Sequence, residues 1–210
     1  GLGMSSKVLT GVLLDFGESF WGTNSMHEEF PGLEQKEFRS TGKFGIGFFS
    51  VFMWGEKVKV ISNKYNQSRE KTMVLDFMKG VDTRPILRKA SEVELVKNGG
   101  SIIRVYLSLS VYNQLLNVGC RDNIKFDETV ARLCFSLDSN LFLTLKGKRK
   151  QLIKANDWKK ISADKFYKRL FGKKEVALFR ERNQNDWKLL CHNLKLLYEK
   201  DGAIVGRACL

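Results

Sequence analysis

The glycine-rich run between residues 42 and 48 has the residue types best suited to chemistry with a phosphate. It is Gly-Lys-Phe-Gly-Ile-Gly-Phe, and it stands where a polar loop passes into an apolar segment of helical character. The first N–H groups of a helix have no partner within it, and glycines let an anion approach them closely. The helix dipole adds only about 0.3–2 kcal/mol, so other contacts must supply most of any nucleotide affinity. The run therefore predicts a phosphate-binding turn.

The spacing of this run excludes two common nucleotide-binding loops. A Walker loop needs a Gly-Lys-Ser/Thr triplet that follows a first glycine by four residues, and a Rossmann loop needs a strand immediately before it. Neither pattern is present around residues 42–48. A buried helix whose glycines serve only packing is the structural alternative for the same residues.

Three short motifs, taken together, resemble one family. Residues 42–52 are similar to the second glycine box of the ninety-kilodalton heat-shock chaperones. Gly1-Leu2-Gly3-Met4 resembles the end of their first box, Asp-x-Gly-x-Gly, and Gly100-Ser101 resembles their Gly-Thr box. The boxes stand in the family's order, with a lid-sized stretch between the first two. Residues 1–110 therefore resemble the GHKL ATPase superfamily of gyrase B, heat-shock chaperones, histidine kinases and MutL.

The resemblance implies a Bergerat-type α/β sandwich that binds ATP with Mg²⁺. Gly1 and Gly3 would let the backbone pass close to the nucleotide, and Met4 would line the adenine pocket. Residues 17–41 would be the lid that closes over ATP, and Ser101 would support adenine recognition through water. The expected ATP-binding residues are Gly1, Gly3, Met4, Lys43, Phe44, Gly45, Ile46, Gly47, Phe48 and Ser101.

Within this set, the residues from Gly45 to Phe48 would offer backbone N–H groups to the terminal phosphates. Lys43 departs from the chaperones, where glutamine is expected. Its ammonium group either adds charge beside the γ-phosphate or points to solvent, and the sequence leaves both interpretations open.

No motif in this sequence identifies counterparts of the family's catalytic residues. The first-box aspartate would lie two residues before Gly1, and an upstream helix would carry the general-base glutamate and the Mg²⁺-binding asparagine. We therefore expect a piece of a longer protein, truncated at its N-terminus, with no catalytic residue of its own. The expectation is that this piece cannot hydrolyse ATP alone although its parent does, and steady turnover by the 210 residues would refute it.

The elements around these motifs predict an α+β fold. We expect a two-layer sandwich in which a mixed or antiparallel sheet carries helices on one face. Apolar spacing predicts a helix over 5–16 with Ser5 as its N-cap, and an all-apolar, buried helix over 42–54. Further predicted strands are 58–62, 72–77, 101–109 and 140–145, and further predicted helices are 124–136, 163–171 and 186–199.

Charge and motif content predict the domain organisation. We expect an ATP-binding domain over 1–145, a basic linker over 146–150 and a partial second, middle-like domain over 151–210. Residues 1–110 carry 15 Lys and Arg against 12 Asp and Glu, whereas residues 111–210 carry 21 against 11. The densest basic stretch, Lys146–Lys150, fits a phosphate-rich partner such as nucleic acid, or else a solvated hairpin tip or linker.

Cysteine usage indicates a cytoplasmic protein. The four cysteines lie far apart and form no CxxC pair, so reduced thiols are expected and a zinc cluster is not. The chain contains no uncharged apolar run long enough to span a membrane and opens with no signal-peptide pattern. We therefore expect no membrane partner.

The predicted function is ATP binding that, with hydrolysis in a homodimeric parent, drives a chaperone-like cycle on a client protein. One alternative is a nucleotide-gated interaction module, such as a defence or signalling ATPase. Another is a nucleic-acid-processing ATPase of the MutL and gyrase type. A steep salt dependence of DNA binding would favour the last, and suppression of client aggregation would favour the first.

Overall fold

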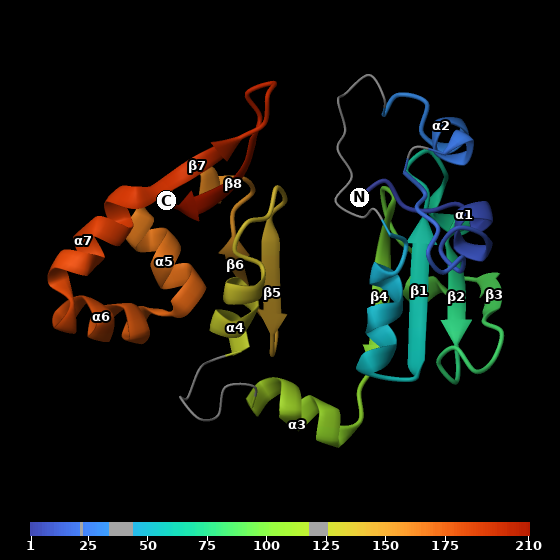
Figure 1. Ribbon diagram of the computed structural model, residues 1–210. Helices are drawn as coiled ribbons and strands as arrows, with labels where there is room; N and C mark the ends of the chain where they lie inside the picture. Colours follow the sequence, from blue (N-terminus) through green and yellow to red (C-terminus); the bar gives the residue numbers. More distant parts are fainter. Residues whose placement is uncertain (22, 34–43, 118–125) are drawn as a thin grey trace. The chain divides into compact units, whose positions relative to one another are not determined.

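The computed structural model describes residues 1–21, 23–33, 44–117 and 126–210, with the side chains of 115–117 left out. The chain divides into two compact units, Gly1–Tyr112 and Asn113–Leu210 (Figure 1). The first unit thus ends before residue 145, where the sequence placed the end of the first domain. The reason is that the helix and strand that follow Asn113 pack within the second unit, where Arg169 donates a hydrogen bond to the carbonyl of Phe135.

An antiparallel sheet forms the first unit, and with its helices it confirms the α+β class. The strand order is β3-β2-β1-β4. Val60 on the central strand β1 pairs with Leu75 on one side and Ile103 on the other. The strands are β1 (Lys57–Asn63), β2 (Met73–Phe77), β3 (Ile86–Lys89) and β4 (Gly100–Tyr106). The three predicted strands of this region are confirmed, and β3 is an addition to them.

The first helix begins where the sequence predicted and ends earlier. In α1 (Ser6–Thr10), the Oγ of Ser5 accepts a hydrogen bond from the N–H of Val8, as an N-cap should. Gly11 then ends the helix, because glycine loses more backbone freedom in a helix than any other residue. Leu9 of α1 is fully buried in the main core with Val58 and Phe77.

The buried helix predicted over 42–54 is wrong for residues 44–54, and residues 42 and 43 lie outside the described part of the chain. Residues Gly47–Met53 form a short 3₁₀ helix, η2, none of whose residues is fully buried. Phe48 and Phe52 pack on Phe77 of β2, while the side chain of Met53 is 83% exposed. A 3₁₀ helix has three residues per turn, so one face covers the sheet and the others meet solvent.

The second unit combines helices with two hairpins. Its elements are α4 (Phe126–Leu133), β5 (Leu141–Leu145), β6 (Lys148–Ile153), η5 (Asp157–Lys159), α5 (Ala163–Phe171), α6 (Lys173–Arg182), α7 (Gln184–Asn193), β7 (Leu194–Tyr198) and β8 (Ile204–Cys209). The helix predicted over 186–199 ends at Asn193, because residues 194–198 pair with β8. The remaining elements are α2 (Asn24–Glu29), η3 (Arg69–Lys71), η4 (Glu92–Glu94) and α3 (Leu109–Asn117).

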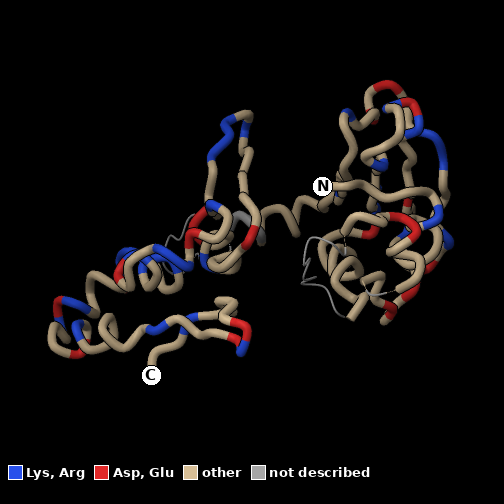
Figure 2. The backbone as a smooth tube through the Cα atoms, turned by 90° about the horizontal axis from the view of Figure 1, so that it is seen from above, with Lys and Arg blue, Asp and Glu red and all other residues tan. Residues whose placement is uncertain are grey.

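The basic stretch 146–150 is part of a hairpin and not a linker. Lys148 pairs with Leu145 and Lys150 with Leu143, so the stretch forms the turn and the first half of β6. Figure 2 shows the Lys and Arg residues along this hairpin. Of the structural alternatives for this stretch, the hairpin tip is the one observed. Across the described ranges, no helix combines the length and apolarity needed to cross a bilayer.

Candidate functional site

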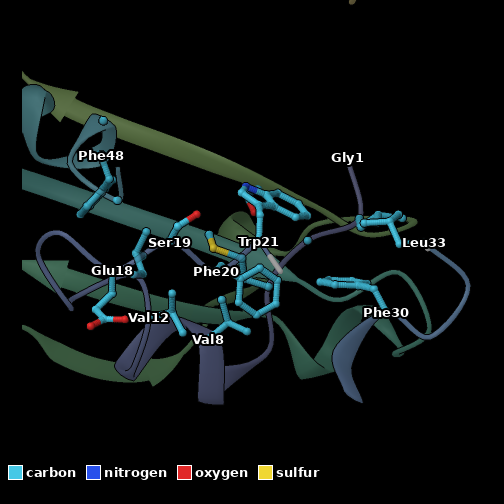
Figure 3. A pocket seen from close by; sticks show the side chains of 17 residues that line it. Gly1, Val8, Val12, Glu18, Ser19, Phe20, Trp21, Phe30, Leu33 and Phe48 are labelled. Atoms are coloured by element: carbon cyan, nitrogen blue, oxygen red, sulfur yellow. The ribbon is translucent and has the colours of Figure 1, made fainter. Parts of the chain in front are cut away.

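A cavity of about 690 Å³ opens in the first unit, between the N-terminal turn, α1 and the start of η2 (Figure 3). Its walls are largely apolar. In Figure 3, Phe30 and Leu33 lie toward one end, Phe48 and Glu18 toward the other, and Phe20 and Trp21 between them. Its volume falls within the range of about 300–1,000 Å³ that small-molecule sites occupy.

Most residues expected from the sequence to bind a nucleotide line this one cavity. Those that line it are Gly1, Gly3, Met4, Gly45, Gly47, Phe48 and Ser101. Phe44 and Ile46 do not line it, and their side chains are 72% and 48% exposed. Lys43 and Gly42 lie outside the described residues. Three motifs far apart in the sequence therefore meet at a single concave site.

Two of the glycines are required for backbone packing. Gly3 has a φ of +70°, and a Cβ there would collide with the carbonyl of Asn63. Gly45 has a φ of +62°, and its Cβ would collide with the backbone of Glu18. Any other residue at these positions would be strained and would push the cavity wall apart.

Gly47 differs from Gly3 and Gly45. Its φ is not in the left-handed region, and a Cβ added to it meets no atom within 4 Å. The space beside Gly47 is therefore open, so a larger side chain could enter it without disturbing the backbone. This makes Gly47 the glycine whose substitution tests the cavity and not the fold.

A buried serine joins two walls of the cavity. Ser62 on β1 is 1% exposed, and its Oγ accepts a hydrogen bond of 2.7 Å from the N–H of Met4. The same Oγ lies 2.8 Å from the Oγ of Ser101 and 3.2 Å from the carbonyl oxygen of Gly100. Ser62 thereby connects the N-terminal glycine turn to the start of β4.

Aromatic side chains that the sequence did not assign to the site form another wall. The ring centroids of Phe20 and Trp21 are 5.5 Å apart, and those of Phe20 and Phe30 are 6.0 Å apart, both pairs edge-to-face. Phe30 also stacks on Tyr65, whose N–H donates to the carbonyl of Leu2. The clue in the sequence was a loop unusually rich in aromatic residues for a solvated segment.

The described part of the expected lid is held against the rest of the unit by Glu29, at the end of α2. Its carboxylate contacts the ammonium of Lys64 at 2.8 Å and accepts a hydrogen bond of 2.8 Å from the hydroxyl of Ser5. Burial opposes ionisation of this carboxyl, but the hydrogen bonds from Lys64 and Ser5 hold the pKa of Glu29 below its ordinary value. Residues 34–43 lie outside the described part.

Glu18 is the one ionisable side chain among the described residues that line the cavity. The side chain of Glu18 is exposed, and its backbone packs against Gly45. Within the described ranges, no three His, Cys, Asp or Glu side chains gather in a way that could hold a metal ion. Glu18 therefore places a carboxylate at the end of the cavity that Gly45 and Gly47 line.

Comparison with known proteins finds no family model that matches. Part of the chain is similar to proteins named chaperone protein HtpG. It is 33% identical over 88 residues to that of Sulfurovum sp. (strain NBC37-1), which is 42% of this chain and 14% of the relative. The HtpG protein of Aliarcobacter butzleri is 38% identical over 69 residues, which cover 33% of this chain and 10% of that relative. The HtpG protein of Borrelia garinii subsp. bavariensis is 32% identical over 108 residues, which cover 51% of this chain and 16% of that relative.

The matched segments thus span between 10% and 16% of the length of these curated relatives. Over a third to a half of its own length, the chain is similar to HtpG chaperones.

Proposed function

We propose that the first unit binds ATP in this cavity, as the nucleotide-binding domain of a chaperone-like protein with a GHKL-type, Bergerat sandwich. The observation that carries the proposal is the convergence of residues 1–4, 45–48 and 101 on one cavity of nucleotide size. The partial similarity to HtpG chaperones supports it independently. Gly3 and Gly45 are explained by backbone packing, but Gly47 lines the cavity beside open space, and packing does not require a glycine there.

The two ends of the cavity suit the two ends of a nucleotide. The aromatic and apolar wall of Phe20, Trp21 and Phe30 offers stacking surface for a base. The turn from Gly45 to Phe48 offers backbone N–H groups, which suit phosphate oxygens. The open space beside Gly47 is where a phosphate would approach.

Mg²⁺ fits this arrangement as a companion of the phosphates. Proteins usually bind it through one or two carboxylates together with substrate phosphates, and Glu18 is the carboxylate at this site. A bound Mg²⁺ would neutralise phosphate charge. Glu18 would hold the ion by an oxygen atom, and the apolar wall would exclude water from the base.

Hydrolysis, dimerisation and client binding are proposed for a longer protein, because the matched segments span only part of the HtpG relatives. In that protein, ATP would bind at this cavity and change how its domains or protomers meet. A catalytic base would come from residues other than those that line the cavity here.

The basic hairpin favours a nucleic-acid-processing ATPase as the second candidate. The guanidinium of Arg149 lies 4.3 Å from the ring centroid of Phe142, whose side chain is 44% exposed. An exposed aromatic ring beside cations is the combination that single-stranded nucleic acids bind. DNA binding with a steep salt dependence, lost in a Phe142→Ala, Arg149→Ala variant, would favour this candidate.

ATP binding by the full chain tests the main proposal, with isothermal titration calorimetry as the measurement. The variant Gly47→Leu places a side chain in the cavity, and Gly32→Leu is its matched control. Gly32 also has open space and no left-handed φ, but it does not line the cavity. We expect at least a tenfold loss of ATP affinity for Gly47→Leu, and an unchanged affinity for Gly32→Leu.

Thermal unfolding should be close to the wild type in both variants. If the wild-type chain binds no ATP, or if Gly47→Leu binds it normally, the cavity is not the nucleotide site.

A further inference from the structure

A second cavity, of about 320 Å³, lies within the second unit, where α4, β6, α5 and the start of α6 meet. Its volume is at the lower end of the range of about 300–1,000 Å³ that small-molecule sites occupy. Asp127 and Glu128 are the acidic residues in its described lining. Six cationic residues line it, and we call it the basic pocket: Arg132, Lys150, Lys165, Lys168, Arg169 and Lys173.

The cations of the basic pocket differ in how far carboxylates satisfy them. Lys150 and Lys168 each contact one carboxylate at 2.7 Å, and the two arginines also have carboxylate partners. An ammonium group has more N–H donors than one such contact uses. Within the described part of the chain, the ammonium groups of Lys165 and Lys173 have no acidic partner. The pocket therefore has positive charge and hydrogen-bond donors that the protein itself does not satisfy.

Arg132 is the least satisfied of the paired cations. Its guanidinium donates to Glu175 from Nη2 at 3.3 Å, a single long hydrogen bond for a group with several N–H donors. The side chain is only 22% exposed, and its Nε is buried without an acceptor among the described residues. A buried donor of this kind is usually explained by a bound water molecule or ion.

The start of α6 adds positive potential to the same pocket. The helix begins after Gly172 with Lys173 and Lys174, and no side chain caps its first N–H groups. The guanidinium of Arg132 lies so close to Gly172 that a Cβ there would collide with it. Cations are unfavourable near a helix N-terminus and anions are favourable, yet Glu175 is the one acidic residue of this first turn. An anion bound between these groups would remove their mutual repulsion.

We infer that the basic pocket binds a phosphate group, held by the ammonium groups of Lys165 and Lys173, by Arg132 and by the first N–H groups of α6. A phosphate group suits this set because its several oxygens accept charge-assisted hydrogen bonds from more than one donor. The pocket and the cavity proposed for ATP lie in different units, so phosphate binding here is independent of the proposed function.

Isothermal titration calorimetry of the full chain with inorganic pyrophosphate in EDTA tests this site. Lys173→Gln removes an ammonium group from the pocket, and Lys174→Gln is the matched control. Both lysines are exposed and belong to the first turn of α6, but only Lys173 lines the pocket. We expect Lys173→Gln to weaken pyrophosphate binding roughly tenfold, as the loss of one hydrogen bond to a charged group should. Lys174→Gln should change it by less than about twofold, because solvent and salt screen an exposed charge.

A matched background keeps the first unit from contributing to the measurement. The same titrations in the Gly47→Leu variant remove any pyrophosphate bound in the cavity of the first unit. The difference between Lys173→Gln and Lys174→Gln should be the same in this background, because Lys173 belongs to the second unit. Thermal unfolding of each variant checks that the chain is folded.

A short single-stranded oligonucleotide without terminal phosphates identifies the source of the phosphate group. If Lys173→Gln weakens its binding as well, the pocket takes the phosphates of a nucleic-acid backbone. If only pyrophosphate responds to Lys173→Gln, the pocket takes the terminal phosphate of a small molecule. Arg149 and Phe142 do not line the pocket, so an oligonucleotide bound only at their face of the hairpin would not respond to Lys173→Gln.

Two results would overturn phosphate binding at the basic pocket. One is a wild-type chain that binds neither pyrophosphate nor the oligonucleotide. The other is a Lys173→Gln variant that weakens binding no more than Lys174→Gln does, which would mean that the general positive charge of the unit attracts the anion. A wild-type chain that binds pyrophosphate through Lys173 but binds no ATP in the first unit would overturn the proposed function alone.

Discussion

At the scale of single residues, identical glycines of the two motifs have different functions. The sequence shows Gly3, Gly45 and Gly47 as equivalent members of boxes, whereas only the first two sit in left-handed backbone against another segment. A pattern of glycines predicts close approach, but it does not say whether protein backbone or a ligand approaches. That distinction depends on what lies opposite each Cα, which only the folded chain determines.

Glu18 permits a prediction about charge at the same end of the cavity. Without a divalent cation, its carboxylate repels the triphosphate, so Glu18→Gln should bind ATP roughly two- to fivefold more tightly in EDTA. With Mg²⁺ present, Glu18→Gln should bind ATP no more tightly than the wild type, because the ion needs the Glu18 carboxylate as a ligand.

Calorimetric titrations in EDTA and in Mg²⁺ measure both effects. Asp15→Asn is the control, since Asp15 is exposed and does not line the cavity. Equal ATP affinities of the wild type and Glu18→Gln in EDTA would place the phosphates away from Glu18.

At the scale of elements, a buried ion network holds η4 against the sheet. Glu94 is 6% exposed, and its carboxylate pairs with both terminal nitrogens of Arg88, at 2.7 and 2.8 Å. It also accepts from the N–H and hydroxyl of Ser91 and lies 3.4 Å from the ammonium of Lys59. The hydrogen bonds from Arg88, opposed by burial, lower the pKa of Glu94 far below its ordinary value.

This network predicts how the stability of the first unit depends on pH. The pKa of Glu94 is lower in the folded than in the unfolded state, so ionised Glu94 stabilises the fold above its ordinary value of about 4.3. That stabilisation is lost as the pH falls below this value toward the folded pKa. Glu94→Gln should therefore lower the free energy of unfolding by about 2 kcal/mol at pH 7 and by clearly less at pH 3.

Urea unfolding at the two pH values measures this difference. Glu92→Gln, an exposed neighbour in the same short helix, should have little effect at either pH. A Glu94→Gln penalty that does not change between pH 7 and pH 3 would mean that the ion pairs contribute nothing.

At the scale of the whole molecule, the chain is built from units with separate cores. Leu9, Val60 and Leu75 belong to the core of the first unit, whereas Tyr167 and Trp187 belong to that of the second. A separate hydrophobic core is the main requirement for a unit to unfold on its own. We therefore predict that the full chain shows two unfolding transitions in differential scanning calorimetry.

Two substitutions assign these transitions. Arg169 forms a bidentate pair with Asp157, at 2.6 and 2.8 Å, which Lys cannot reproduce. Arg169→Lys should cost the second unit about 1–2 kcal/mol and lower only its transition. Glu94→Gln should lower only the transition of the first unit. A single transition that both variants shift would show that the units unfold together.

Several local features were determined by the sequence alone. Ser5 begins α1, and strands β1, β2 and β4 lie where apolar residues of high strand propensity predicted them. Helix α5 has the predicted bounds, Ala163–Phe171. Capping, propensity and hydrophobic periodicity act between residues close in the chain, so the sequence records them directly. The glycine boxes and their resemblance to heat-shock chaperones are readable for the same reason.

Only the tertiary structure decided which residues share a cavity, where the units divide and what an apolar segment covers. The aromatic wall of Phe20, Trp21 and Phe30 and the link from Ser62 to Ser101 arise from residues brought together by folding. Likewise, the sequence marked residues 42–54 as apolar but not that one face would meet solvent. Such features depend on contacts between distant segments, and no local pattern specifies the partner of a side chain.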